Sequence, residues 1–198
     1  MTKEEKVEKF AKELDFIGTP RIKQAGEILV GKIPDYFFEV AASSTGKYHP
    51  KISLGKGGLL RHTKAAVRFA YWQLSLEMFD KYSQEEKDLM ILALIMHDSR
   101  KHGESIEQNK FTVTEHPVIA ANAVEIDADI KGLLSEEEIT LMSGCILTHM
   151  GQWNTDRYKR EFAPKPFTKY QNFVHLCDYL ASRKSNNMEF DENDEIIE

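Results

Sequence analysis

The sequence predicts an all-α protein. No stretch of the 198 residues keeps the alternation of Val, Ile and Thr that is typical of half-buried strands. Apolar residues instead recur at helical spacing, and several segments begin with a capping box, in which Ser or Thr is followed three residues later by Glu. No internal repeat or glycine-rich linker divides the chain. We therefore expect helices packed around one core.

Start and stop signals place the helices in order. The expected helices begin at Thr2, Pro20, Pro34, Gly58, Ser83, His116, Ser135 and Phe167. The first is an amphipathic helix within residues 1–14, and Gly31 is the expected end of the second. The third covers 35–43, the long fourth helix runs from Gly58 to about Met78, and the last ends near 184. The acidic tail, 186–198, is expected to be mobile or loosely docked.

Composition narrows the class of protein. The formal net charge of −6 and the pI of about 5.7 make a long nucleic-acid partner unlikely, because phosphate backbones favour basic surfaces. Cys145 and Cys177 form neither a disulfide framework nor a zinc ribbon, so we expect reduced core thiols. The N-terminus has no signal-peptide core, and no apolar run approaches the roughly 20 residues that span a bilayer. These features predict a cytoplasmic protein without membrane association.

The segment Leu89 to Lys101 carries the strongest chemical signal. Six apolar residues, Ile91 to Met96, run directly into His97 and Asp98. Two titratable side chains at the end of a buried helix are costly unless they are paired. A divalent metal ion would pair with both, since imidazole and carboxylate are good ligands for such ions. The alternative is a hydrogen-bonded core histidine beside a helix-terminal aspartate.

The wider pattern resembles the HD superfamily of metal-dependent phosphohydrolases. The matching segments are GGLLRHT with His62, MHDSRK with His97 and Asp98, and HLCDYLASR with Asp178, together spanning about residues 57 to 184. Lys101 matches a lysine that often follows the His-Asp pair in this family, whereas Arg100 replaces the usual glycine. The resemblance implies one HD-type helical domain over 1–198, with a core of about 57–185 and the N-terminal helices of 1–50 packed on it.

The resemblance also implies a ligand set. His62, His97, Asp98 and Asp178 would hold one ion, and His116 and His149 would complete a second site with Asp98 as the bridge. If only one metal binds, His116 and His149 would contact substrate phosphate instead. Mixed imidazole and carboxylate ligation favours Mn or Fe, with Co, Ni, Mg or Zn as further candidates. His175, three residues before Asp178, is either a second-shell partner or an ordinary core or edge histidine.

Other polar residues are candidates for substrate contact. The loop 43–49 is rich in hydroxyl and backbone donors, yet it is no Walker A loop, because Ala41 stands where that motif needs its first glycine. We expect Lys47, His49 and Arg61 to bind phosphate and Asp98 and Lys101 to act in catalysis. Arg61 adjoins His62 and can face away from it.

These features predict a phosphohydrolase that cleaves a phosphoester of a nucleotide or related small compound with a metal-activated water. One alternative is a ribonuclease or other nucleic-acid phosphodiesterase, although the chain has no room for a separate nucleic-acid-binding module. The other is a metal- or nucleotide-binding protein without turnover. The sequence does not indicate an oligomeric state.

Overall fold

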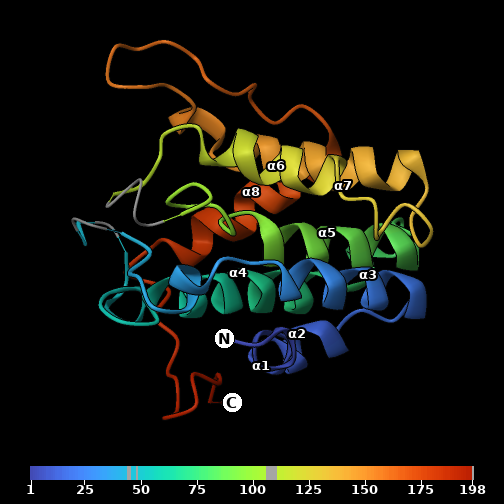
Figure 1. Ribbon diagram of the computed structural model, residues 1–198, viewed down its shortest axis with the longest axis horizontal. Coiled ribbons are helices and arrows are strands. Elements are labelled where there is room, and N and C mark those ends of the chain that lie inside the picture. Colours follow the sequence, from blue (N-terminus) through green and yellow to red (C-terminus); the bar gives the residue numbers. More distant parts are fainter. Residues whose placement is uncertain (44–45, 48, 106–110, 198) are drawn as a thin grey trace.

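The computed structural model describes residues 1–43, 46–47, 49–105 and 111–197. Over these residues the fold is all-helical, with eight α-helices, four short 3-10 helices and no β-sheet (Figure 1). The α-helices are α1 (Lys3–Glu8), α2 (Ala11–Asp15), α3 (Pro20–Gly31), α4 (Gly58–Leu74), α5 (Gln84–Met96), α6 (His116–Glu125), α7 (Glu136–Thr148) and α8 (Lys169–Ala181). The predicted fold class is confirmed.

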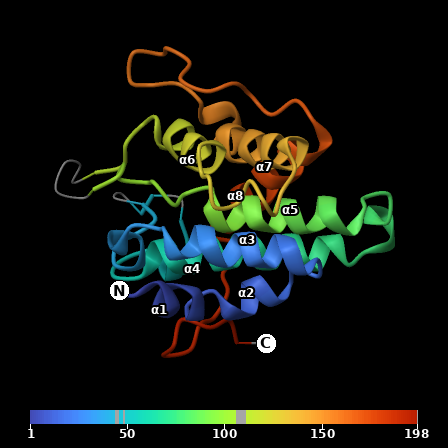
Figure 2. The same ribbon diagram turned by 45° about the vertical axis from the view of Figure 1, so that its right-hand side comes forward.

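The central helix α5 is buried from Asp88 to Met96 and contacts α3, α4, α7 and α8. On one side α3 and α4 cover it, with α1 and α2 below them, and on the other side α6 packs on α7 (Figures 1 and 2). The ends of α4, α5, α6 and α7 that carry the candidate histidines all lie toward the left of Figure 1. The topology therefore gathers four predicted ligands at one end of the molecule.

The capping boxes expected at Thr2, Ser83 and Ser135 are present, each with both reciprocal hydrogen bonds. These motifs depend on residues three apart, so the sequence alone identifies them. Other boundaries were predicted wrongly. The expected helix over 35–43 is a single 3-10 turn, Asp35–Phe38, and the long helix ends at Leu74 rather than near Met78.

Both differences follow from burial. Tyr36, Phe37 and Phe38 are all buried, and three consecutive residues of an α-helix cannot face one side because neighbours point about 100° apart. Beyond Leu74 the chain leaves the core, as the exposure of Met78 shows. The first amphipathic segment is likewise divided into two short helices, α1 and α2.

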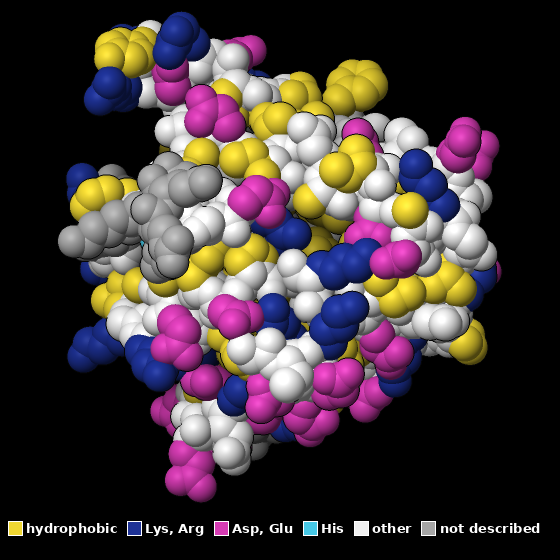
Figure 3. Space-filling view, in the orientation of Figure 1, with side chains coloured by type: hydrophobic (Ala, Val, Ile, Leu, Met, Phe, Trp, Pro, Cys, Tyr) yellow, Lys and Arg dark blue, Asp and Glu magenta, His cyan; other side chains and the backbone are white. Residues whose placement is uncertain are grey.

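The acidic tail is docked by buried charges, contrary to the expectation of a mobile or loosely attached segment. Glu195 accepts a 2.5 Å hydrogen bond from the fully buried ammonium of Lys64, and Asp194 pairs with Arg61 at 2.6 Å. Ile196 is buried in the same contact. Figure 1 shows the tail descending past α4 to end near α1 and α2, and Figure 3 shows acidic side chains gathered over this part of the surface. The tail thus packs on α4 through Arg61 and Lys64.

Two further expectations concern the cysteines and the possibility of a membrane-spanning helix. Cys145 and Cys177 are free and buried, and burial raises the pKa of the Cys145 thiol to about 12. None of the described helices is both long and apolar enough to cross a lipid bilayer.

Candidate metal centre

Four histidines and two aspartates from five helices meet in one buried cluster. His97 and His149 are the C-cap residues that directly follow α5 and α7, His116 begins α6, and His62 lies in the second turn of α4. Asp98 follows His97 directly, and Asp178 comes from the middle of α8. The four histidines and Asp98 are each no more than 1% exposed. Every predicted metal ligand is therefore brought to this cluster.

Distances within the cluster divide it into two overlapping groups around Asp98. Its Oδ2 atom lies 3.5 Å from Nε2 of His97 and 3.9 Å from Nε2 of His62. Its Oδ1 atom lies 3.0 Å from Nε2 of His116 and 3.5 Å from Nε2 of His149. One carboxylate thus presents a different oxygen to each pair of imidazoles, as a bridge between two ions requires.

Asp178 closes the first group. Its Oδ1 atom lies 3.0 Å from Nε2 of His62 and 3.6 Å from Nε2 of His97. The sets His62–His97–Asp98, His97–His149–Asp178 and Asp98–His116–His149 each have ligand atoms within 4.8 Å of one another. Ligand atoms about 2.0–2.2 Å from a shared ion stand at comparable separations, so each set can surround one cation.

Backbone carbonyls three residues earlier in the chain fix the orientation of three imidazoles. Nδ1 of His97 donates to the carbonyl of Leu94 at 2.6 Å, and Nδ1 of His149 donates to that of Ile146 at 2.7 Å. His116 makes the same bond to the carbonyl of Val113, also at 2.7 Å. Because a carbonyl only accepts, the hydrogen must be on Nδ1, and Nε2 points its lone pair into the cluster. This is the arrangement that proteins use to orient metal-binding histidines.

The contacts between the imidazole Nε2 atoms and the carboxylate oxygens need a cation between them. Nε2 of His97, His116 and His149 and Oδ1 of Asp98 are buried without a hydrogen-bond partner in the described structure. Each imidazole lone pair faces a carboxylate oxygen, and two acceptors at 3.0–3.6 Å repel unless a proton or metal ion lies between them. Four imidazoles and two carboxylates therefore fit a divalent ion.

The same crowding shifts the pKa values of the ligands. Burial opposes ionisation of Asp98 and Asp178, but neighbouring positive charge and hydrogen bonds outweigh it, so both pKa values lie well below their ordinary range. Burial also opposes protonation of His97, yet the two carboxylates raise its pKa. Burial and the nearby Lys101 lower the pKa of His116 to about 4, so this imidazole is neutral at pH 7.

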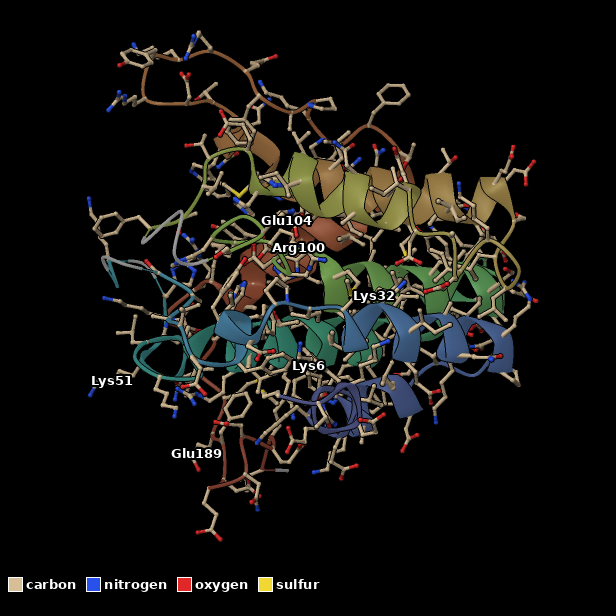
Figure 4. The ribbon with its side chains drawn as sticks, viewed as in Figure 1. Lys6, Lys32, Lys51, Arg100, Glu104 and Glu189 are labelled. Carbon is tan, nitrogen blue, oxygen red and sulfur yellow. The ribbon has the colours of Figure 1, made fainter. Side chains whose placement is uncertain are left out.

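Lys101 also lies at the cluster, with its ammonium 2.7 Å from Oδ2 of Asp98. The turn that carries it is fixed to the N-terminal half of the chain. Arg100 donates to the carbonyl of Lys32 and pairs with Glu104, and Figure 4 shows Arg100 and Glu104 lying together near α5. Arginine at this position therefore anchors the turn to the end of α3.

Tyr36 gives the same turn a second anchor. Its hydroxyl donates to the carbonyl of Gly103 at 2.6 Å and accepts from the backbone N–H of His102. His102 itself is buried and its ring lies 5.4 Å from that of Tyr36. Neither Tyr36 nor Arg100 was predicted to support the site, because only the folded chain brings 32–36 beside 98–104.

Arg61 was predicted to bind substrate, but its guanidinium faces away from the cluster. It pairs with Asp194 and donates to the carbonyls of Ile52, Leu54 and Lys56. These contacts hold the chain before α4 and the tail together, and we no longer assign Arg61 to substrate. Gly58 explains part of the Gly-Gly motif nearby, since a Cβ there would lie 2.4 Å from the carbonyl oxygen of Ser53.

The loop before α4 places one predicted substrate residue at the cluster. The ring of His49 lies 5.5 Å from that of His62, and burial together with His62 lowers the pKa of His49 to about 4. Lys47 is exposed. Ser44, Thr45 and Tyr48 of the expected phosphate-binding loop lie outside the described residues.

His175 supports the second group of ligands from outside. Its Nδ1 donates to the backbone carbonyl of His149 at 2.6 Å, so it contacts the His149 side of the centre rather than the Asp178 carboxylate. The 3-10 turn Gly151–Trp153 follows His149, and Gly151 has a φ of +58° with the His175 ring packed against it. The spacing before Asp178 had singled out His175, but nothing in the sequence linked it to Gly151.

Comparisons with protein-family models, with characterised proteins and with solved structures found no match to this chain. The all-helical fold and the buried His/Asp cluster are compatible with an HD-like site.

Proposed function

We propose that this protein is a metal-dependent phosphohydrolase of the HD type, acting on a nucleotide or a related small phosphorylated compound. The observation that supports this most is the buried cluster in which three imidazoles and Asp98 leave lone pairs without a hydrogen-bond partner. A bound divalent ion supplies Lewis acidity and a water whose pKa is lowered toward neutrality. Phosphoester hydrolysis is the reaction class that uses both properties.

The residues of the chain have distinct roles in this proposal. His62, His97, Asp98 and Asp178 would hold one ion, and His116 and His149 would hold a second together with Asp98. Mixed nitrogen and carboxylate ligation favours Mn or Fe over Mg. The three histidines that end or begin their helices keep their donors on the backbone, which leaves Nε2 for the ion.

Lys101 and His49 border the cluster on its substrate side. The ammonium of Lys101 has three donors and uses one on Asp98, so it can also donate to a phosphate oxygen held beside that carboxylate. His49 is neutral at pH 7 because its pKa is about 4, and it therefore serves as a hydrogen-bonding group. Together they supply charge and orientation for an anionic substrate.

Metal analysis followed by a phosphate-release screen tests the proposal. The screen includes nucleotides, cyclic dinucleotides and short RNA, so that a nucleic-acid phosphodiesterase would be detected as well. Asp98→Asn should remove bound metal and abolish hydrolysis while leaving the helical circular dichroism signal unchanged. Asp129→Asn is the matched control, because Asp129 is an exposed carboxylate that pairs with Lys32 away from the cluster.

Full hydrolysis by a metal-free Asp98→Asn protein would eliminate metal catalysis. Stable metal binding by the wild type without turnover on any compound of the screen would instead identify a metal-binding protein without catalysis.

A further inference from the structure

A pocket lies between the loop before α4 and the chain that follows α8. Its volume is about 590 Å³, within the range of roughly 300–1,000 Å³ that small-molecule sites occupy. The residues that line it are Gly46, His49, Pro50, Lys51, Leu54, Lys184 and Asn187. The pocket is therefore built from two segments that are far apart in the sequence.

His49 connects this pocket to the metal centre. It lines the pocket while its ring lies 5.5 Å from that of the ligand His62. Its Nδ1 atom is buried without a hydrogen-bond partner in the described structure. A small molecule in the pocket could therefore bond to the His49 ring, which lies next to His62 of the metal centre.

The charge of the pocket is positive in an acidic protein. Lys51 and Lys184 both line it, and neither forms an ion pair with any part of the chain that the structure describes. Figure 4 shows Lys51 at the same end of the molecule as the start of α4. Lys32, by contrast, is neutralised by Asp127 and Asp129. The two lysines of the pocket thus leave positive charge for an anionic ligand.

The remaining lining residues are suited to the apolar, organic part of a small molecule. Pro50 and Leu54 contribute apolar surface to the lining. Small-molecule sites typically combine such apolar walls with a few charged groups that fix orientation. An ammonium binds phosphate as a point charge and does not need one exact geometry.

Building on the function proposed above, we propose that this pocket binds the part of the substrate that is not cleaved. Lys51 and Lys184 hold a second phosphate group there while the scissile phosphate lies at the metal centre. The substrate class is therefore an organic compound that carries at least two phosphate groups, and compounds with one phosphate are bound more weakly.

The test compares two ligands that differ by one phosphate, adenosine 5′-monophosphate and adenosine 3′,5′-bisphosphate. Their dissociation constants are measured by calorimetry on the full chain loaded with Mn²⁺. We expect wild-type protein to bind the bisphosphate at least tenfold more tightly. Lys51→Gln with Lys184→Gln should reduce this preference to less than threefold.

Two control proteins make the result specific. Lys131→Gln with Lys165→Gln removes the same charge at exposed positions that do not line the pocket, and it should keep the preference. Lys51→Arg with Lys184→Arg keeps the charge of the pocket and should also keep the preference for the bisphosphate. Equal affinity of the wild type for the two ligands, or an unchanged preference in the glutamine variant, would overturn the proposal. Binding needs no turnover, so a lack of phosphate release would count against the proposed function and not against the pocket.

Discussion

Gly151→Ala tests the link between His175 and the end of α7. The backbone at Gly151 has φ +58°, and an added Cβ would lie 2.2 Å from Cε1, 2.4 Å from Nε2 and 2.6 Å from Nδ1 of His175. The ring would have to move, and its 2.6 Å hydrogen bond to the carbonyl of His149 would be lost. The substitution therefore combines a backbone penalty with the loss of a contact next to a candidate metal ligand.

The magnitude follows from these two terms. A non-glycine residue in the left-handed region costs about 1–2 kcal/mol, and the lost hydrogen bond costs about 0.5–1.5 kcal/mol. The sum, about 1.5–3.5 kcal/mol, corresponds to a fall in melting temperature of roughly 3–14 °C for a chain of this size. Metal-free protein is the sample to use, because bound metal adds its own stabilisation.

Thermal unfolding followed by circular dichroism measures the effect in two backgrounds. In a His175→Ala protein no ring opposes the new Cβ, so Gly151→Ala should cost only the backbone penalty of about 1–2 kcal/mol. The difference between the two backgrounds isolates the contact. An equal cost of Gly151→Ala with and without the His175 ring would refute the reasoning.

Three further predictions follow. Replacing both His116 and His149 with Ala should lower the metal content from two ions per chain to one, measured by elemental analysis under saturation, and cut turnover sharply; a wild type that never exceeds one ion would contradict the two-metal assignment. The carboxylates of the cluster outweigh burial and raise the pKa of His97 above its ordinary 6.5, so protons compete with metal for Nε2 of His97 up to a higher pH than they do for an ordinary imidazole. Metal affinity should then rise with pH above 6.5 by up to about tenfold per unit, and constant affinity from pH 6.5 to 8 would exclude this. Lys64→Met should destabilise the protein by about 3–5 kcal/mol in denaturant unfolding, because it leaves the buried Glu13 without its cation, and adding Glu13→Gln should recover part of the loss.

Local signals in the sequence predicted much of the fold. The capping boxes at Ser83 and Ser135 and the Pro117 turn placed the helices that carry His97, His149 and His116, because each signal involves residues within one helical turn. The resemblance to HD proteins then selected six ligands, and the structure brings all of them together.

The features that the sequence did not predict depend on contacts between distant segments. The tail was expected to be loosely held because its composition is acidic, yet Lys64 on α4 lies buried against Glu195. Arg61 adjoins His62, and the sequence left open whether its side chain binds substrate or faces away from the cluster. Its ion pair with Asp194, 133 residues later in the chain, turns it away from the cluster. The support of His149 by His175 and the anchoring of Arg100 on α3 likewise exist only after the helices have packed.

The hydrogen bonds from Nδ1 of three histidines of the cluster to nearby backbone carbonyls have a consequence for how metal would be loaded. Each of His97, His116 and His149 bonds to a carbonyl three residues earlier in its own chain segment, so its rotamer is set by local structure. Side chains that are already ordered lose little conformational entropy when they bind, and that entropy is otherwise a cost of about 1 kcal/mol per side chain. Folding thus prepares the centre in advance, and an incoming ion would meet imidazoles whose orientation is already set.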